Sequence, residues 1–238
     1  MDQLLVALDV DTVAEARTMA NRLRGAVGGF KIGSRLYTAE GPRAVEELVA
    51  RGDRVFLDLK FHDIPNTVAG ASAAATRLGV WMMNVHASGG AAMMTAARDA
   101  AHEEAARGGQ QPPLVIAVTV LTSLSDQMIG EIGIRDSIAA QVERLAALAE
   151  SSGLDGVVAS PQEVSLIRRR CRRGFAVVTP GIRGSGDPAG DQSRTMTAAE
   201  ALAAGATYLV VGRPIIGAAD PRAAAERIAA ECRGAHVS

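Results

Sequence analysis

Short, almost continuously apolar runs recur along the whole chain and are separated by longer amphipathic segments. Strands that are buried on both faces carry such runs, whereas half-exposed strands alternate apolar and polar residues. The pattern therefore predicts eight buried parallel strands, at Leu4–Leu8, Gly29–Ile32, Val55–Leu59, Trp81–Val85, Leu114–Val120, Gly156–Ala159, Phe175–Thr179 and Tyr208–Val211.

The segments between these runs are rich in alanine and have the spacing of amphipathic helices. Thr12 followed by Glu15 is a helix-start signal, and Gly79 and Gly153 stand where helix C-caps are expected. Helices are predicted at Thr12–Leu23, Arg43–Ala50, Thr67–Leu78, Ala91–Arg107, Ser137–Glu150 and Ala223–Ala230, with a further helix starting near Pro161.

This regular alternation predicts an α/β fold, and its count favours a (β/α)8 TIM barrel. Eight strand–helix units in 238 residues match that barrel, which runs to about 250 residues. A doubly wound open sheet is the alternative, but no glycine-rich fingerprint follows the first strand. No linker or shift in composition divides the chain, so residues 1–238 are expected to form a single barrel domain. The long irregular segment Pro180–Ser193 follows the seventh strand and is typical of a functional loop.

Composition and charge exclude several classes of protein. The 48% hydrophobic and 21% charged residues are typical of a globular chain, and a net charge of −1 argues against a nucleic-acid binder. No apolar stretch is long enough for a membrane span, and no basic segment precedes the first apolar run, as a signal peptide would require. Cys171 and Cys232 match no metal-ligand or redox spacing, which fits a reducing cytoplasm. We therefore expect a cytoplasmic protein.

Lysine is unusually scarce. Lys31 and Lys60 are the only lysines among 25 lysine and arginine residues. A lysine ammonium is compact and can release a proton, whereas an arginine guanidinium is wide and effectively cannot. The two lysines are therefore candidates for positions where arginine would not serve, although chance survival would leave the same two residues.

Both lysines lie at predicted strands, where barrel enzymes place their chemistry at the C-terminal ends. Asp58 and Lys60 are two residues apart at the end of the third strand, so their side chains are expected to share a face. Lys31 on the second strand can reach the same space. A Lys–Asp–Lys cluster in the barrel mouth indicates a catalytic site, because buried charges are costly unless they serve one. A salt-bridge layer that only fills the mouth would use the same residues.

The end of the eighth strand indicates a phosphate site. Gly212 would let an anion approach the backbone, and Arg213 would add a charged fork before a helix start at Pro214. The loops after strands seven and eight commonly bind phosphate in this fold. Arg183 and Gln192 lie in the neighbouring long loop and could close over the anion. An ordinary glycine turn beside a surface arginine is the alternative.

The segment from Asp58 to Thr67 reads D-L-K-F-H-D-I-P-N-T and resembles the orotidine 5′-phosphate decarboxylase family, whose hallmark is D-x-K-x-x-D-I-P-x-T. The resemblance continues along the whole chain. It includes Ala7-Leu8-Asp9, Phe30-Lys31-Ile32-Gly33, Val85-His86-Ala87, Thr119 to Ser123, Thr179 to Arg183, Asp191-Gln192 and Val210 to Ile215. Several separated motifs in the right order are more specific than any one of them.

The resemblance implies decarboxylation of orotidine 5′-phosphate to uridine 5′-phosphate (UMP) and CO2, the last step of de novo UMP synthesis, without a cofactor or metal. It implies that Lys60 is the catalytic acid, that Asp58 lies against the substrate carboxylate, and that Lys31 contacts the ribose and orders the charges. The remaining implied contacts are Asp9 with the ribose and Thr122 with the pyrimidine. Arg183, Gln192, Gly212 and Arg213 would bind the phosphate, and Pro180 is a further substrate-binding residue.

The resemblance also implies a homodimer with shared active sites, in which Asp63, Ile64 and Thr67 reach the site of the neighbouring subunit. A surface aspartate that only caps the next helix is the alternative for Asp63. His62 and His86 receive no role from the sequence.

Two other functions remain open. A metal-dependent sugar-phosphate decarboxylase or hexulose-phosphate synthase shares D-x-K-x-x-D, but such relatives tend to carry a metal-binding glutamate where this chain has Lys31, and they lack Ile-Pro-x-Thr. A non-catalytic sugar-phosphate sensor would need the phosphate end but not the costly charges of Asp58, Lys60 and Asp63.

Overall fold

The chain folds into a closed barrel of eight parallel strands in the order β1 to β8, with β8 pairing with β1. The computed structural model describes residues 2–182 and 196–234. The closed barrel confirms the predicted TIM fold and excludes the open doubly wound sheet. The strands are β1 (Leu4–Ala7), β2 (Gly29–Gly33), β3 (Val55–Phe61), β4 (Met82–His86), β5 (Leu114–Val118), β6 (Gly156–Val158), β7 (Ala176–Thr179) and β8 (Tyr208–Val211).

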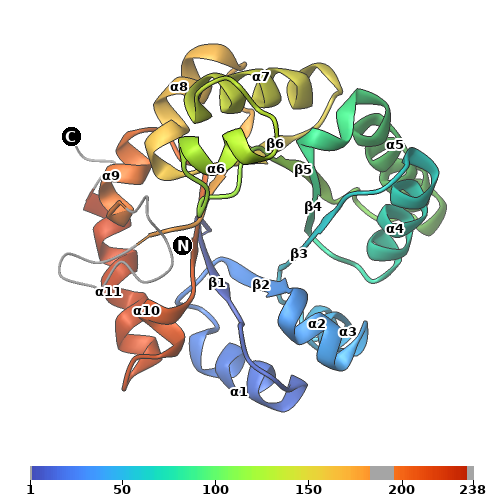
Figure 1. Cartoon of the computed structure of the whole chain (residues 1–238). Coiled ribbons are helices and arrows are strands. Elements are labelled where there is room, and N and C mark those ends of the chain that lie inside the picture. Colours follow the sequence, from blue (N-terminus) through green and yellow to red (C-terminus); the bar gives the residue numbers. More distant parts are fainter. Residues whose placement is uncertain (1, 183–195, 235–238) are drawn as a thin grey trace.

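Helices surround the strands, as the view along the barrel shows (Figure 1). They are α1 (Val13–Leu23), α2 (Ser34–Glu40), α3 (Arg43–Val49), α4 (Pro65–Arg77), α5 (Gly90–Gly108), α6 (Asp126–Glu131), α7 (Ile138–Ser151), α8 (Val164–Arg170), α9 (Ala198–Ala203), α10 (Arg213–Ile216) and α11 (Pro221–Gly234). Short 3-10 turns, η1 (Ala87–Gly89) and η2 (Pro161–Glu163), precede α5 and α8.

Local sequence signals set several of these helix ends. The Thr12 side chain accepts a hydrogen bond from the Glu15 N–H, and the Glu15 carboxylate accepts one from the Thr12 N–H, which forms the predicted capping box of α1. Gly79 follows Leu78, the C-cap residue of α4, with a φ of 76°, a left-handed conformation that glycine adopts without steric cost.

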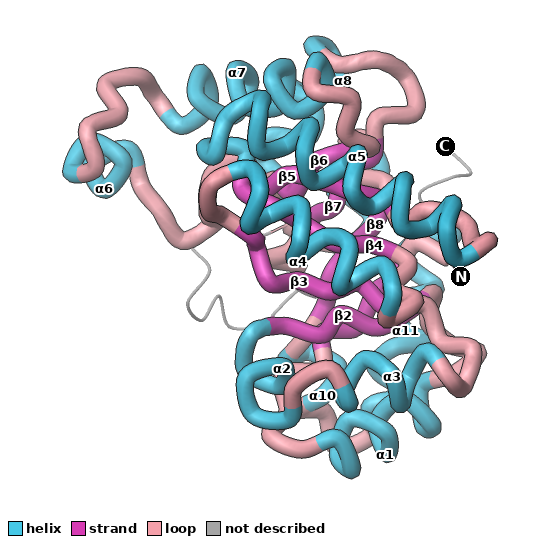
Figure 2. The backbone as a smooth tube through the Cα atoms, turned by 90° about the vertical axis from the view of Figure 1, so that its right-hand side faces the viewer, coloured by secondary structure: helices cyan, strands magenta, loops and turns pink. Residues whose placement is uncertain are grey.

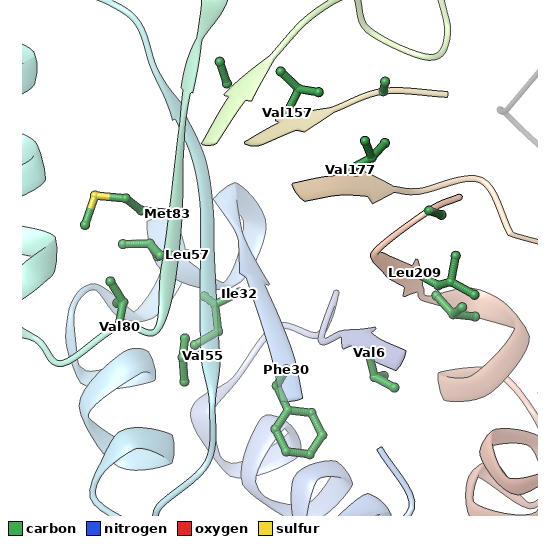
Figure 3. Packing of buried hydrophobic residues seen from close by; sticks show 14 of the residues in the cluster. Val6, Phe30, Ile32, Val55, Leu57, Val80, Met83, Val157, Val177 and Leu209 are labelled. Atoms are coloured by element: carbon green, nitrogen blue, oxygen red, sulfur yellow. The ribbon is translucent and has the colours of Figure 1, made fainter. Parts of the chain in front are cut away.

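Two apolar layers hold the barrel together, because neighbouring strand residues point to opposite faces. The larger cluster lies between strands and helices and includes Phe30, Ile32 and Leu57, which Figure 3 shows in close view. A smaller cluster, which includes Leu5, Phe56 and Val210, fills the inside of the barrel. The polar residues on the inner face of the barrel therefore lie against a layer of apolar side chains.

Three helices were not predicted: α2, α6 and α9. Helix α6 buries only Ile129 and lies away from the barrel wall, on an excursion that Figure 2 shows at the upper left. Helix α2 likewise buries only Leu36. Such short helices carry too few apolar positions to show a helical period. Among the residues that the structure describes, no helix is long and apolar enough to cross a membrane.

Candidate active site

A cavity of about 280 Å³ opens at the C-terminal ends of the strands. Its inner part is lined by apolar side chains that include Phe56, Val118 and Val178. Eight of the predicted site residues line the same cavity: Asp9, Lys31, Asp58, Lys60, Thr122, Pro180, Gly212 and Arg213. The structure therefore brings together the predicted charge cluster and the described part of the predicted phosphate end.

The charges in this cavity form a connected array. The Lys60 Nζ lies 2.6 Å from Asp58 Oδ1, and the Lys31 Nζ lies 3.3 Å from Asp58 Oδ2. Lys31 also lies 3.5 Å from Asp9 Oδ1. The side chains of Lys31 and Asp58 are only 11% and 13% exposed, whereas that of Lys60 is 35% exposed. Among the four charged side chains, only that of Asp9 is more exposed to a ligand than that of Lys60.

Asp58 remains ionised at neutral pH. Burial raises the pKa of its carboxyl, but the charges of Lys31 and Lys60 and the hydrogen bonds from Lys60 and Asn84 together outweigh burial, so the pKa is lowered from 3.8. The cavity consequently holds a fixed, desolvated carboxylate between two ammonium groups.

The backbone at Lys60 departs from a regular strand. Its φ is +55°, and Lys60 is the only non-glycine residue with a positive φ in the described ranges 2–182 and 196–234. The register between β3 and β4 shifts in the same place, between Leu57 and Phe61. Such a conformation costs about 1–3 kcal/mol and persists only where the surroundings impose it. The predicted meeting of Asp58 and Lys60 is confirmed, but regular strand alternation is the wrong reason for it.

Asn84 is the residue that reasoning from the sequence missed. It lies on β4, fully buried, and its Nδ2 donates a hydrogen bond of 2.7 Å to Asp58 Oδ1. Its Oδ1 accepts a hydrogen bond of 2.8 Å from the Lys60 N–H. A polar residue inside an otherwise apolar strand, next to the strand that carries Asp58 and Lys60, is the signal that could have revealed it.

The opposite side of the cavity carries the predicted phosphate residues. Gly212 lies beside Ala7 and Asp9, because a Cβ atom at this position would be 3.5 Å from the Ala7 Cβ and 3.6 Å from Asp9 Oδ2, both ordinary contact distances. Arg213 is exposed and begins α10. Arg183 and Gln192 lie outside the described residues, so their predicted contacts remain predictions.

Asp63, Ile64 and Thr67 do not line this cavity. All three are exposed around the start of α4, and Ile64 is 66% exposed. The Asp63 Oδ1 accepts a 2.6 Å hydrogen bond from the Ile64 N–H. Their predicted contribution to a neighbouring subunit stays a prediction.

His62 and His86 form a pair beside the charge array, with ring centroids 5.4 Å apart. Burial lowers the pKa of His86 from 6.5, and the nearby His62 and Lys60 lower it further, against the opposite effect of Asp58. Neither histidine belongs to a metal centre: within residues 2–182 and 196–234, no three His, Cys, Asp or Glu side chains are grouped so as to hold a metal ion.

A closed barrel with a mouth of lysine and aspartate at the strand ends defines a TIM-barrel enzyme. The chain belongs to the orotidine 5′-phosphate decarboxylase / HUMPS family, whose model matches residues 2–228. The family predicted from the separated motifs is therefore confirmed, and with it the prediction of an enzyme of the carboxy-lyase class.

Individual relatives agree with this assignment over nearly the whole chain. The chain is 55% identical to the orotidine 5′-phosphate decarboxylase of Moorella thermoacetica, covering 97% of this chain and 92% of the relative. It is 54% identical to that of Syntrophotalea carbinolica, covering 98% and 96%. The crystal structure of orotidine 5′-phosphate decarboxylase from Lactobacillus acidophilus matches with a TM-score of 0.87 and 37% identity, covering 98% of this chain and 99% of that one.

Proposed function

We propose that the chain decarboxylates orotidine 5′-phosphate to UMP and CO2 as the last step of de novo UMP synthesis, with Lys60 as the proton donor. The observation that carries the proposal is the Lys60 ammonium, which lies 2.6 Å from Asp58, a largely buried aspartate in the barrel cavity. The similarity to relatives that carry the name orotidine 5′-phosphate decarboxylase supports the choice of substrate.

The chemistry requires a positive charge next to one carbon atom. When the bond between C6 and the carboxylate breaks, its electron pair stays on C6, where the pyrimidine ring delocalises it poorly. A fixed ammonium at that place stabilises the developing charge electrostatically. The Lys60 Nζ then transfers a proton to C6, which gives UMP and leaves a neutral amine that regains its proton from solvent.

Asp58 serves this reaction in two ways. Its hydrogen bond with Lys60 holds the ammonium in place, and Lys31 on the other side keeps the carboxylate charged. The substrate carboxylate would lie against Asp58, so its departure as neutral CO2 relieves a repulsion between two negative groups. Asp9, which lies 3.5 Å from Lys31, would receive the ribose hydroxyls.

The far side of the cavity would bind the rest of the nucleotide. Arg213 and the backbone at Gly212 would hold the phosphate, with Arg183 and Gln192, while Pro180 and Thr122 would border the base. Phosphate binding far from the reacting carbon supplies energy that orients the base over Lys60. Asp63, Ile64 and Thr67 would complete the site of a partner subunit in a cytoplasmic homodimer.

The proposed reaction needs no cofactor, because the protein itself supplies the stabilising charge. A metal-dependent sugar-phosphate reaction is less compatible with this site. The Lys31 ammonium already lies within 3.5 Å of both Asp9 and Asp58, where it would repel a divalent cation.

The test is a spectrophotometric assay of orotidine 5′-phosphate loss in the presence of EDTA. We expect full turnover with the chelator. Turnover that EDTA abolishes and a divalent metal restores would overturn the cofactor-free mechanism. No turnover of this substrate, together with turnover of a hexulose phosphate, would move the chain to the other branch of its family.

A further inference from the structure

Lys60 occupies a backbone conformation that its own chemistry disfavours. In the left-handed region the Cβ atom of an L-residue crowds the neighbouring carbonyl oxygen, and lysine has no short polar group to offset this. The register shift places three residues of β3, from Asp58 to Lys60, opposite the single residue Asn84 of β4. The ladder of backbone hydrogen bonds is interrupted at this point, so another group has to hold Lys60.

The side chain of Asn84 occupies this break in the ladder. Its oxygen accepts the Lys60 N–H at 2.8 Å and its nitrogen donates to Asp58 Oδ1 at 2.7 Å. The same Asp58 oxygen receives the Lys60 ammonium at 2.6 Å. One amide group therefore closes a ring of contacts that includes both the backbone and the side-chain nitrogen of Lys60.

We propose that Asn84 is a positioning residue, which holds Lys60 in its left-handed conformation and aims the Asp58 carboxylate at the ammonium. This inference rests on the proposed function, because it assigns Asn84 a part in the same decarboxylation. Asn84 itself does not line the cavity and touches no reacting atom.

The amide suits this position better than other groups of its size. It presents one acceptor to the N–H and one donor to the carboxylate, without adding a charge to the array of Lys31, Asp58 and Lys60. A leucine would satisfy neither partner. An ionised aspartate would accept the N–H but place a second negative charge against Asp58, whereas a protonated aspartate could both accept and donate.

The first experiment compares Asn84→Ala with wild type. We expect kcat to fall at least 100-fold, with the dissociation constant of UMP changed less than threefold, because the phosphate and ribose contacts remain. Asn21→Ala is the matched control, since Asn21 is exposed on α1 and its Oδ1 accepts a hydrogen bond from Arg24. A kcat within threefold of wild type, or equal losses in kcat and UMP affinity, would overturn the proposal.

The second experiment uses the isosteric Asn84→Asp variant and follows the ratio of its kcat to that of wild type against pH. The charged and titratable groups around this position are Asp58, Lys60 and Lys31, with His86 on the same strand and His62 beside it; the facing residue on β5 is Ile116. We expect the ratio to rise at least tenfold from pH 8 to pH 5, as the new carboxyl takes up a proton. A ratio that does not change with pH would contradict the proposed donor and acceptor roles.

A crystal structure of Asn84→Ala gives a readout that does not depend on turnover. We expect Lys60 to leave its positive φ and the bond between Lys60 and Asp58 to lengthen. If Lys60 keeps both, Asn84 does not position Lys60. If Asn84→Ala does not fold, the pH series and the crystal structure of the isosteric Asn84→Asp variant decide the question. A wild-type enzyme without activity on orotidine 5′-phosphate would instead refute the proposed function, and this structural comparison would still decide the role of Asn84.

Discussion

The Lys31 ammonium lies where a side chain on Gly33 would begin. A Cβ atom added to Gly33 would come within 2.9 Å of Lys31 Nζ, although the backbone there, with a φ of −99°, is open to any residue. Glycine at this position therefore leaves room for the Lys31 ammonium, which a larger residue would displace, and meets no conformational requirement. The position of Lys31 in the charge array therefore depends on Gly33 having no side chain, as well as on Asp9 and Asp58.

Gly33→Ala should lower activity without lowering stability. Displacing Lys31 by a fraction of an ångström disturbs both of its contacts, so kcat/KM is expected to fall about 10- to 100-fold. The free energy of unfolding should stay equal or rise by about 0.4–1 kcal/mol, because alanine restricts the unfolded chain. Gly108→Ala is the control, since its Cβ would meet only Gln110 at ordinary contact distance. Unchanged kcat/KM in the Gly33 variant would contradict this account.

Lys60→Ala should abolish turnover, and Lys60→Arg should not restore it. Losing a preorganised electrostatic donor costs about 10²–10³ in rate, and Lys60 would also carry the proton, so the loss is expected to be larger. Arginine is too wide for the place beside Asp58 and does not release a proton. Circular dichroism and thermal unfolding check that both variants fold. Decarboxylation near the wild-type rate by Lys60→Arg would remove Lys60 as the acid.

Arg213→Ala should weaken UMP binding by about 2–5 kcal/mol, the scale for truncating one partner of a desolvated charge pair. The measurement is a calorimetric titration with UMP. Arg107→Ala is the matched control, because Arg107 is exposed on α5 and pairs with Glu103 and Glu104 far from the cavity. Equal affinities of the Arg213 variant and wild type would show that the phosphate does not bind at the end of β8.

The barrel could be predicted from the sequence because strands that are buried on both faces consist of continuous apolar runs. These runs remain strands in the folded protein. The cavity followed from the fold, since strand ends converge at one rim. The role of Asn84 could not be predicted in the same way, because the left-handed Lys60 arises only when β3 and β4 pair out of register. Helix α9 illustrates a missed local signal: Thr197 and Glu200 form a capping box that the sequence displays.

The stability of the protein should depend on pH through His86. Folding lowers the pKa of His86 from 6.5, so the unfolded chain takes up this proton at a higher pH than the folded chain does. The contribution of neutral His86 to the free energy of unfolding is complete above pH 6.5. It is lost as the pH falls toward the lower pKa of the folded state, by at most about 1.4 kcal/mol per pH unit for one proton. His86→Gln should reduce the dependence of the free energy of urea unfolding on pH between pH 6.5 and pH 5. Parallel curves for wild type and His86→Gln would contradict the assignment.

Two subunits should together build each active site. Asp58 and Lys60 point into their own cavity, but the chain turns outward before Pro65 begins α4, and Asp63 and Ile64 are left exposed. In a two-fold dimer, a contact that places Asp63 of one subunit beside Lys60 of the other is made twice. We therefore expect an inactive Lys60→Ala chain and an inactive Asp63→Asn chain to complement each other after mixing and subunit exchange.

Each heterodimer has one site with both substitutions and one site with neither. In an equal mixture half of the dimers are heterodimers and half of their sites are intact, so up to about a quarter of wild-type activity should return. Self-mixing of each variant is the control, and exchange is followed by differently tagged chains. If exchange is complete and activity stays absent, each site belongs to one chain, and Asp63 acts, if at all, only within its own subunit.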